Sequence, residues 1–336
     1  MKTYIEKVVN GTDLNQSEMA EAFDLIMSGE ATPAQIAGFV TALRMKGETI
    51  EEIAGGAETM RRHAVFVDPG GLPVVDTCGT GGDACDTFNV STTTAFVVAG
   101  AGEPVAKHGN RAISSKCGSA DLLAELGVTL DVTLETVEDC IREVGIGFLF
   151  APKLHPAMKH AMGPRRELGI RTIFNMLGPL TNPAGAKGQI LGVFAPELTE
   201  TFAQVLKRLG SRRAFVVHGH DGMDEITTTT TTRVSELRDG TVRTYDLDPL
   251  DFIEDYADAS ALVGGSPKIN ADITLRILKG EKGAPRDIVC LNAAAALVAG
   301  GGAENLHDGW QRAHESIDSG KALEALNALI AATADG

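Results

Sequence analysis

The feature that most constrains the fold is a change of pattern at Pro69-Gly70-Gly71. Beyond it, short β-prone runs alternate with helical stretches. We expect strands at 73–76, 104–106, 147–150, 190–194 and 214–218, and helices at 91–99, 120–126, 134–144 and 197–209. This alternation is typical of a mainly parallel sheet flanked by helices. The sequence therefore predicts an α/β domain over residues 71–336, with a hairpin at 233–244 and helices from Asn270 onward.

Residues 1–70 have a different pattern, which indicates helices joined by short turns. Apolar residues recur at helical spacing from Met19 to Met27, and Thr32-Pro33 and Thr49–Glu52 are start signals for two further helices. We expect a small N-terminal helical domain, extended by added helices from about 155–185. Its apolar faces fit either an intrachain core or a contact that forms a dimer.

Composition excludes several classes of protein. The 336 residues include 30 Lys and Arg against 45 Asp and Glu, a net charge of −15, which disfavours nucleic acid and anionic membranes as partners. No apolar run is long enough to span a bilayer, and the first residues lack the pattern of a secretory signal. Five cysteines without a C-x-x-C pair indicate reduced thiols. We therefore expect a cytoplasmic protein.

The segment Val74–Asp83 runs from a strand into a turn with three glycines, and a helix pattern follows at Asn89–Thr92. Backbone amides in such a turn can converge on an anion at a helix N-terminus. The motif fits a phosphate cradle, although a tight strand–helix connection would have the same pattern. It does not match an ATP or GTP P-loop. Asp83 would suit a sugar hydroxyl or a magnesium ion better than a phosphate.

A second polar segment, Lys107–Asp121, follows the next expected strand. Its cations, hydroxyls, amides and glycines suit several phosphate oxygens, whereas Arg111 and Lys116 taken singly would be ordinary surface charges. A third segment, His218–Glu225, places two adjacent carboxylates after a strand. Asp224 and Glu225 suit a hard cation such as magnesium, and the two histidines leave zinc open.

Two further sequence features leave more than one interpretation open. The basic stretch from His155 to Pro183 offers arginines to a carboxylate substrate, although surface basic residues have the same pattern. The threonine run 227–232 predicts an extended segment, because threonine is β-branched.

Taken in order, these segments resemble the anthranilate phosphoribosyltransferase family over nearly the whole chain. The matching motifs are GTGGD (Gly79–Asp83), NVST (Asn89–Thr92), KHGNRAISSKCGSAD (Lys107–Asp121), the segment His155–Pro183 and HGHDGMDE (His218–Glu225). Two stretches depart from the family pattern: Ala84-Cys85-Asp86, where relatives often carry glycine or serine, and the threonine run. The resemblance implies a pentosyltransferase of tryptophan biosynthesis that acts as a homodimer through its helical part.

The resemblance also implies roles for single residues. Those that would bind phosphoribosyl pyrophosphate are Gly79, Gly82, Asp83, Thr87, Asn89, Val90, Ser91, Thr92, Lys107, His108, Gly109, Asn110, Arg111, Ala112, Ile113, Ser114, Ser115 and Ser119. Those that would contact anthranilate or line its route are Gly79, His108, Asn110, His155 and Arg165. Ser91, Asp224 and Glu225 would hold magnesium, with two ions per subunit, and Lys107 and Asp83 would be catalytic.

The implied reaction replaces pyrophosphate on the ribose anomeric carbon by the amine of anthranilate. That amine is uncharged at neutral pH, so charge stabilisation and alignment matter more than a strong base. Two alternatives stay open at this point. A pyrimidine nucleoside phosphorylase would share the fold and a glycine-rich phosphate loop, and a non-enzymatic relative would bind nucleic acid.

Overall fold

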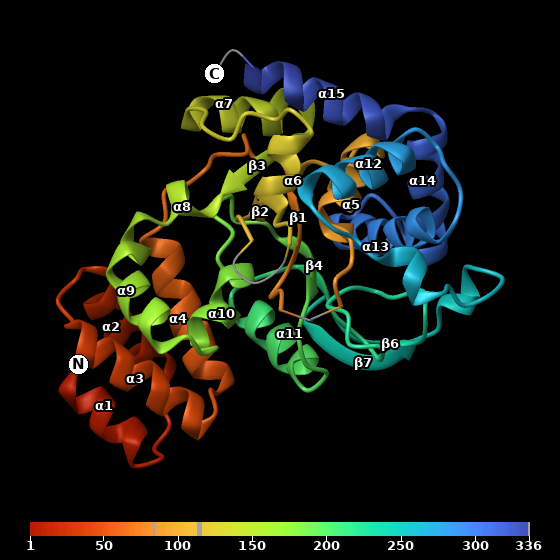
Figure 1. Ribbon diagram of the computed structural model, residues 1–336. Helices are drawn as coiled ribbons and strands as arrows, with labels where there is room; N and C mark the ends of the chain where they lie inside the picture. Colours follow the sequence, from red (N-terminus) through yellow and green to blue (C-terminus); the bar gives the residue numbers. More distant parts are fainter. Residues whose placement is uncertain (83–84, 113–115, 335–336) are drawn as a thin grey trace.

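The computed structural model describes residues 1–82, 85–112 and 116–334. Four of the predicted site residues, Asp83, Ile113, Ser114 and Ser115, lie outside this described part. Within it, no helix has the length and apolar character needed to cross a bilayer. The N-terminus lies among the first helices, and the chain runs to the opposite end of the molecule, beside α7 (Leu134–Asp139) and α15 (Lys321–Ala334) (Figure 1).

The first helices form a compact bundle at one end of the molecule (Figure 1). They are α1 (Lys2–Val9), α2 (Gln16–Met27), α3 (Pro33–Lys46) and α4 (Ile50–Arg62). Asn15, Thr32 and Thr49 each close a capping box, in which the cap side chain and the third helical residue bond each other's backbone N–H. The predicted start signals are therefore confirmed at Thr32 and Thr49, and the apolar face from Met19 to Met27 is buried.

The large part is built on one sheet of seven described strands, in the order β3-β2-β1-β4-β5-β6-β7. The strands are β1 (Val75–Gly79), β2 (Val105–Gly109), β3 (Ile146–Phe150), β4 (Gly188–Gly192), β5 (Arg213–Gly219), β6 (Thr232–Arg238) and β7 (Thr241–Leu247). The first five are parallel and the last two are antiparallel. The predicted α/β class with a helical N-terminal part and a mainly parallel sheet is confirmed.

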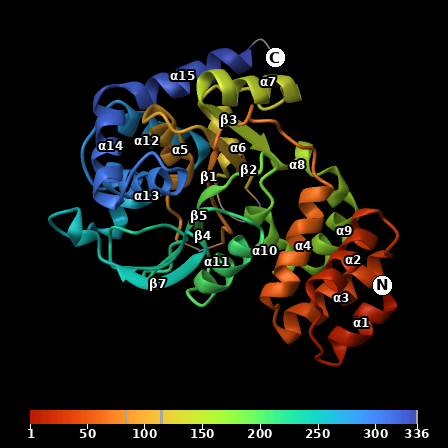
Figure 2. The same ribbon diagram turned by 180° about the vertical axis from the view of Figure 1, so that it is seen from behind.

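Helices cover both faces of this sheet (Figures 1 and 2). One face packs against α5 (Val90–Gly100) and α13 (Ala284–Gly300), outside which lie α14 (Leu306–Asp318) and α15; α11 (Leu198–Arg208) covers β5 and β6 on the other. Along β5 the side chains alternate between two cores, with Phe215 and Val217 in one and Ala214 and Val216 in the other. Further helices are α6 (Ser119–Glu125) and α12 (Pro267–Leu278).

The basic stretch after β3 crosses to the N-terminal bundle. It contains α8 (Ala151–Leu154), α9 (Lys159–Leu168) and α10 (Ile173–Leu177). Helix α9 packs on α2 and α3, and α10 packs on α3 and α4. Their apolar residues join the core of the bundle, for example Ala161, Ile173 and Leu177. This stretch therefore links the bundle to the edge of the sheet.

The structure changes three local predictions. The expected helix 134–144 ends at Asp139 and continues as a π-helical turn, Cys140–Val144, before Gly145 stops it with a φ of 83°. The strand expected at 73–76 extends to Gly79, so Gly79 belongs to the strand rather than to the turn. The threonine run is a bent loop in which only Thr232 is in a strand, because the Thr227 and Thr229 hydroxyls bond the Asp221 carboxylate instead.

The hairpin prediction is confirmed by β6 and β7. Asp239 and Gly240 join them with φ values of 49° and 75°, the pair of positive angles that a two-residue type I′ turn requires.

Candidate active site

The sheet order reverses between β1 and β4, and this position decides where a ligand can bind. From β1 the chain first adds β2 and β3 on one side and later β4 and β5 on the other. In open parallel sheets, ligands bind outside the carboxyl ends of the strands at such a switch point. The loops after β1 and β2 and the segment after β5 all leave from this edge. These are the three segments that the sequence singled out.

The loop after β1 is tied to the acidic segment after β5. The Gly81 amide donates to the Asp224 carboxylate at 2.8 Å. A Cβ at Gly79 would lie 2.5 Å from the Asp224 Oδ2 atom, so a side chain there would displace the Asp224 carboxylate. The Ser91 amide, in the first turn of α5, donates to the Glu225 carboxylate at 3.2 Å. The two carboxylates thus lie where the glycine turn and a helix N-terminus converge.

Lys107 is the buried cation of this edge. Lys107 lies in β2 and is only 3% exposed. Its ammonium donates to the Thr77 carbonyl and lies 3.5 Å from the Ser91 hydroxyl. Burial lowers the pKa of Lys107, and the charge of Asp76 opposes that lowering. A buried ammonium of this kind strongly attracts any anion bound beside it, because little water screens its charge.

Asp76 is a residue that the sequence analysis did not assign. It is fully buried, and its carboxylate accepts the His108 amide at 3.1 Å and the Asn182 carboxamide at 2.8 Å. Burial raises the pKa of Asp76, and the nearby Lys107 charge opposes this. Asp76 is therefore the fixed counter-charge of Lys107. The signal available in the sequence was that Asp76 is a polar residue in a strand whose neighbouring residues are expected to be buried.

The loop after β2 closes around Asp121 and Ser119. The Asp121 carboxylate accepts the amides of Ala112 at 2.8 Å and Gly118 at 3.0 Å and pairs with the Arg111 guanidinium at 2.9 Å. The Ser119 hydroxyl accepts the Asn110 amide at 3.1 Å. The described binding residues predicted on this loop, Asn110, Arg111, Ala112 and Ser119, are thus held together at the start of α6.

The two polar loops are also tied to each other. Asn89 donates to the Cys117 carbonyl at 3.0 Å, and Lys116 pairs with Asp86 at 2.8 Å. Thr87 forms a bridge with Val263, which holds the end of the glycine loop against the segment before α12. The predicted residues Gly82, Val90 and Thr92 lie in the same loop and the first turn of α5. The structure therefore brings both loops to one place.

His108 and His155 connect this place to the stretch that crosses to the helical bundle. Their Nε2 atoms lie 3.2 Å apart and both rings are buried. Burial lowers the pKa of His108 to about 3 and that of His155 to about 4, so both rings are neutral at pH 7. One ring then donates to the other. Because His155 precedes α9, this contact joins the β2 loop to the basic stretch.

Arg165 is placed within α9. Its guanidinium lies over the Phe174 ring of α10, with 5.3 Å to the ring centroid, and burial lowers its pKa. Among the described residues, no hydrogen bond, ion pair or ring contact joins Arg165 to Asn110, which is also predicted to bind anthranilate. Arg171 reaches the glycine loop instead: it donates to the Gly82 carbonyl and stacks 4.4 Å from the centroid of Phe194. The sequence analysis gave Arg171 no role of its own.

The acidic segment suits magnesium better than zinc. Asp224, Glu225 and Ser91 offer oxygen ligands, and Mg²⁺ commonly binds one or two carboxylates together with water and substrate phosphates. The described residues contain no group of three or more His, Cys, Asp or Glu able to hold a metal ion, as a closed zinc site would require. His218 bonds the Val193 carbonyl at 2.7 Å and His220 bonds Asp246 at 3.1 Å, so these rings face different partners.

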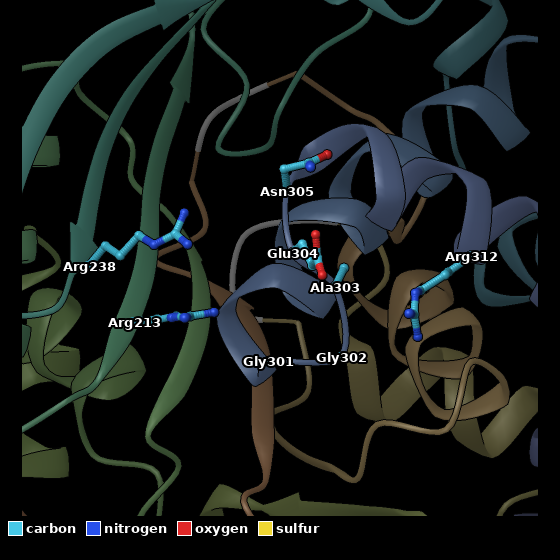
Figure 3. Close-up of a pocket in the computed structure, with 8 residues that line it drawn as sticks. All are labelled: Arg213, Arg238, Gly301, Gly302, Ala303, Glu304, Asn305 and Arg312. Carbon is cyan, nitrogen blue, oxygen red and sulfur yellow. The ribbon is translucent and has the colours of Figure 1, made fainter.

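A cavity of about 600 Å³ lies at the opposite edge of the sheet, where β5 begins and β6 ends (Figure 3). It is lined by Arg213, Arg238, Gly301, Gly302, Ala303, Glu304, Asn305 and Arg312. Its three arginines already have partners: Arg213 donates to the Val298 carbonyl at 3.2 Å, Arg312 pairs with Asp308 at 3.0 Å, and Arg238 lies 3.9 Å from Asp239. None of the predicted site residues that the structure describes lines it, and it lies at the amino ends of the parallel strands.

Comparison with known proteins agrees with the switch-point site. Residues 2–64 match the helical bundle domain of the glycosyl transferase family, and residues 71–323 match its a/b domain. The anthranilate phosphoribosyltransferase of Desulfosudis oleivorans is 60% identical over 327 residues, which cover 97% of this chain and 96% of the relative. The chain belongs to the anthranilate phosphoribosyltransferase family.

Solved structures of family members share the fold. The anthranilate phosphoribosyltransferase of Thermus thermophilus superimposes with a TM-score of 0.93 at 43% identity, covering 98% of this chain and 99% of that one. The enzyme of Saccharomyces cerevisiae in complex with PRPP and Mg has a TM-score of 0.89 at 32% identity, with coverage of 99% and 98%. These relatives support the family prediction and neither the nucleoside phosphorylase nor the nucleic-acid alternative.

Proposed function

We propose that the protein transfers the phosphoribosyl group of phosphoribosyl pyrophosphate to the amine of anthranilate, giving N-(5-phosphoribosyl)anthranilate and pyrophosphate. One observation carries this conclusion: Lys107, the glycine loop and the start of α5 converge beside Asp224 and Glu225 at the switch point of the sheet. This is an anion site with two carboxylates at its rim. Such a pairing suits a pyrophosphate that binds together with a divalent cation.

The chain's own residues perform three tasks in this proposal. The amides of the loops after β1 and β2 and of the first turn of α5 hold the phosphate oxygens. The residues predicted to bind phosphoribosyl pyrophosphate, from Gly79 to Ser119, would take part in this binding. Among them, Asp83 would bind a ribose hydroxyl. Lys107 stabilises the negative charge that grows on the leaving pyrophosphate as the anomeric C–O bond breaks. The amine nitrogen forms the new bond to that carbon and loses one proton.

Anthranilate would bind between the β2 loop and the basic stretch. Arg165 is a planar cation suited to the anthranilate carboxylate, and Gly79 at the end of β1 and Asn110 after β2 are the residues proposed to contact the ring or its amine. The neutral pair His108–His155 lies at the junction of these two elements and would line the route, because neutral rings favour an aromatic acid's apolar face without trapping its carboxylate.

Two Mg²⁺ ions per subunit would be held by Asp224, Glu225 and Ser91 together with the substrate. The ions would neutralise charge on the pyrophosphate. We also propose the division into a helical part (1–70, with the added helices of 155–185) and a catalytic part (71–336), homodimer formation through the helical part, and a cytoplasmic location. The five free cysteines support a reducing compartment.

The test is direct. Purified protein is mixed with anthranilate, phosphoribosyl pyrophosphate and Mg²⁺, and anthranilate fluorescence is followed. We expect a loss of fluorescence that needs all three components and stops when a chelator is added. A folded protein that leaves the fluorescence unchanged would contradict the proposal and would make phosphorolysis of thymidine the next assay.

A further inference from the structure

The buried carboxamide of Asn292 lies behind the acidic segment. Asn292 is in the middle of α13, far along the chain from the site, and is 1% exposed. Its Oδ1 atom accepts the Ile226 amide at 2.9 Å, and its Nδ2 atom donates to the Ile226 carbonyl at 2.8 Å and to the Ile288 carbonyl at 2.8 Å. One side chain therefore binds both polar groups of a single backbone residue.

That backbone residue follows Glu225 directly. Ile226 is fully buried, and the chain around it is a loop rather than a strand or helix. Just before it, Glu225 accepts the Ser91 amide and Asp224 accepts the Gly81 amide. The Asn292 carboxamide thus fixes the peptide next to the two carboxylates that bracket the anion site.

A second contact shows how closely the segment fits the sheet. A Cβ at Gly192, the last residue of β4, would overlap the Asp224 carbonyl oxygen. The segment is therefore held between the end of β4 on one side and α13 on the other. Because α13 itself packs on β4 and β5, a rigid layer of the core fixes the position of the two carboxylates relative to the switch point of the sheet.

We propose that Asn292 is a positioning residue for Asp224 and Glu225, and that it sets the affinity of the site for the complex of Mg²⁺ with phosphoribosyl pyrophosphate. It touches neither ligand and acts through the Ile226 peptide. This inference rests on the proposed function. Supporting groups behind metal-binding carboxylates typically change affinity by about 10- to 100-fold when removed.

The test measures binding rather than turnover. Phosphoribosyl pyrophosphate is titrated into the dimeric protein by calorimetry, with Mg²⁺ and with EDTA. For Asn292→Ala we expect affinity in Mg²⁺ to fall by about tenfold or more, with a much smaller change in EDTA, since the carboxylates act through the cation. The matched control is Thr333→Val, which removes a part-buried hydrogen bond that the Thr333 hydroxyl accepts from the Thr129 amide, far from the site. We expect it to bind as the wild type does.

A double mutant separates positioning from general damage. In a background that carries both Asp224→Asn and Glu225→Gln, Asn292→Ala is expected to weaken binding by less than twofold, because both groups it positions are already altered. Additive losses would overturn the proposal. If Asn292→Ala does not fold, Asn292→Asp replaces it in both measurements. This variant retains an acceptor for the Ile226 amide but turns a carboxylate oxygen toward the Ile226 and Ile288 carbonyls, so a loss of affinity at least as large is expected.

The possible failures are distinct. If the wild-type protein binds phosphoribosyl pyrophosphate and a folded Asn292 variant binds it equally well, the positioning role is wrong and the proposed function stands. If the wild-type protein does not bind phosphoribosyl pyrophosphate at all, the proposed function falls and this inference falls with it.

Discussion

The two edges of the central sheet both carry basic residues, yet they differ in how those residues are held. At the carboxyl edge, Lys107 is buried, faces carbonyl and hydroxyl oxygens, and has Asp76 as a fixed counter-charge. At the amino edge, Arg238 and Arg312 line an open cavity and pair with acids close by in sequence. The difference teaches that a cluster of charge does not define a site. Convergent backbone donors and desolvation do.

The strongest way to test this comparison is to remove the buried cation. Lys107→Ala is expected to lower kcat/KM by about 10³-fold, because a preorganised charge aimed at the leaving group is lost from a site with little water. Steady-state kinetics of the anthranilate reaction measure this. Circular dichroism of the variant is the control for folding, and a loss below tenfold in a folded variant would contradict the role of Lys107.

The acidic segment at the same edge should give the next largest effect. Asp224→Ala combined with Glu225→Ala is expected to lower turnover by about 10²-fold and to raise the Mg²⁺ concentration needed for half-maximal rate. A Mg²⁺ titration at fixed substrate concentrations measures it. An unchanged dependence on Mg²⁺ would remove both residues from the metal site.

Arg165 tests whether the basic stretch serves the acceptor. Arg165→Ala is expected to raise the KM for anthranilate by some tens of times, roughly the value of one charge-assisted hydrogen bond, and to leave the KM for phosphoribosyl pyrophosphate within about threefold. Arg166→Ala on the same helix is the matched control. Equal effects on both KM values would show that Arg165 does not belong to the anthranilate site.

The buried histidine pair gives a pH prediction. The folded pKa values of about 3 for His108 and about 4 for His155 lie below the unfolded value, so the unfolded chain binds more protons in this range. Their contribution to stability is complete above pH 6.5 and is lost as the pH falls toward 4. At pH 5 each ring should cost about 2 kcal/mol of unfolding free energy.

Urea unfolding at pH 7 and pH 5 measures this loss. The double variant His108→Asn with His155→Asn should lose clearly less stability between these two pH values than the wild type does. A pH dependence as steep as that of the wild type would mean that other groups cause the loss.

The smallest effect is expected at the amino edge. Arg238→Ala should change kcat/KM by less than about twofold, because its exposed pair with Asp239 contributes little and no site residue in the described part of the chain bonds with it. The same kinetic assay applies. A loss as large as that of Lys107→Ala would mean that the arginine-lined cavity takes part in the reaction and would overturn the comparison.

Local chemistry made much of the fold predictable. Capping boxes at Thr32 and Thr49 and the Asp239-Gly240 turn act between residues a few positions apart, so their signal is present in the chain itself. The prediction that the threonine run is extended was wrong for a different reason. The strand preference of threonine is a weak local effect. The hydrogen bonds that two hydroxyls of the run donate to the Asp221 carboxylate outweigh it.

The candidate site divides in the same way. The sequence by itself determined which side chains could carry the chemistry, because glycine loops, Lys107 and the Asp224-Glu225 pair are chemically distinctive after strands. Only the tertiary structure decided how they are held. Asp76, Asn182 and Asn292 look like ordinary polar residues in strand, loop and helix patterns. The contacts that tie them to the site join residues 32 to 106 positions apart along the chain. Long-range packing creates those contacts, and no short-range pattern encodes them.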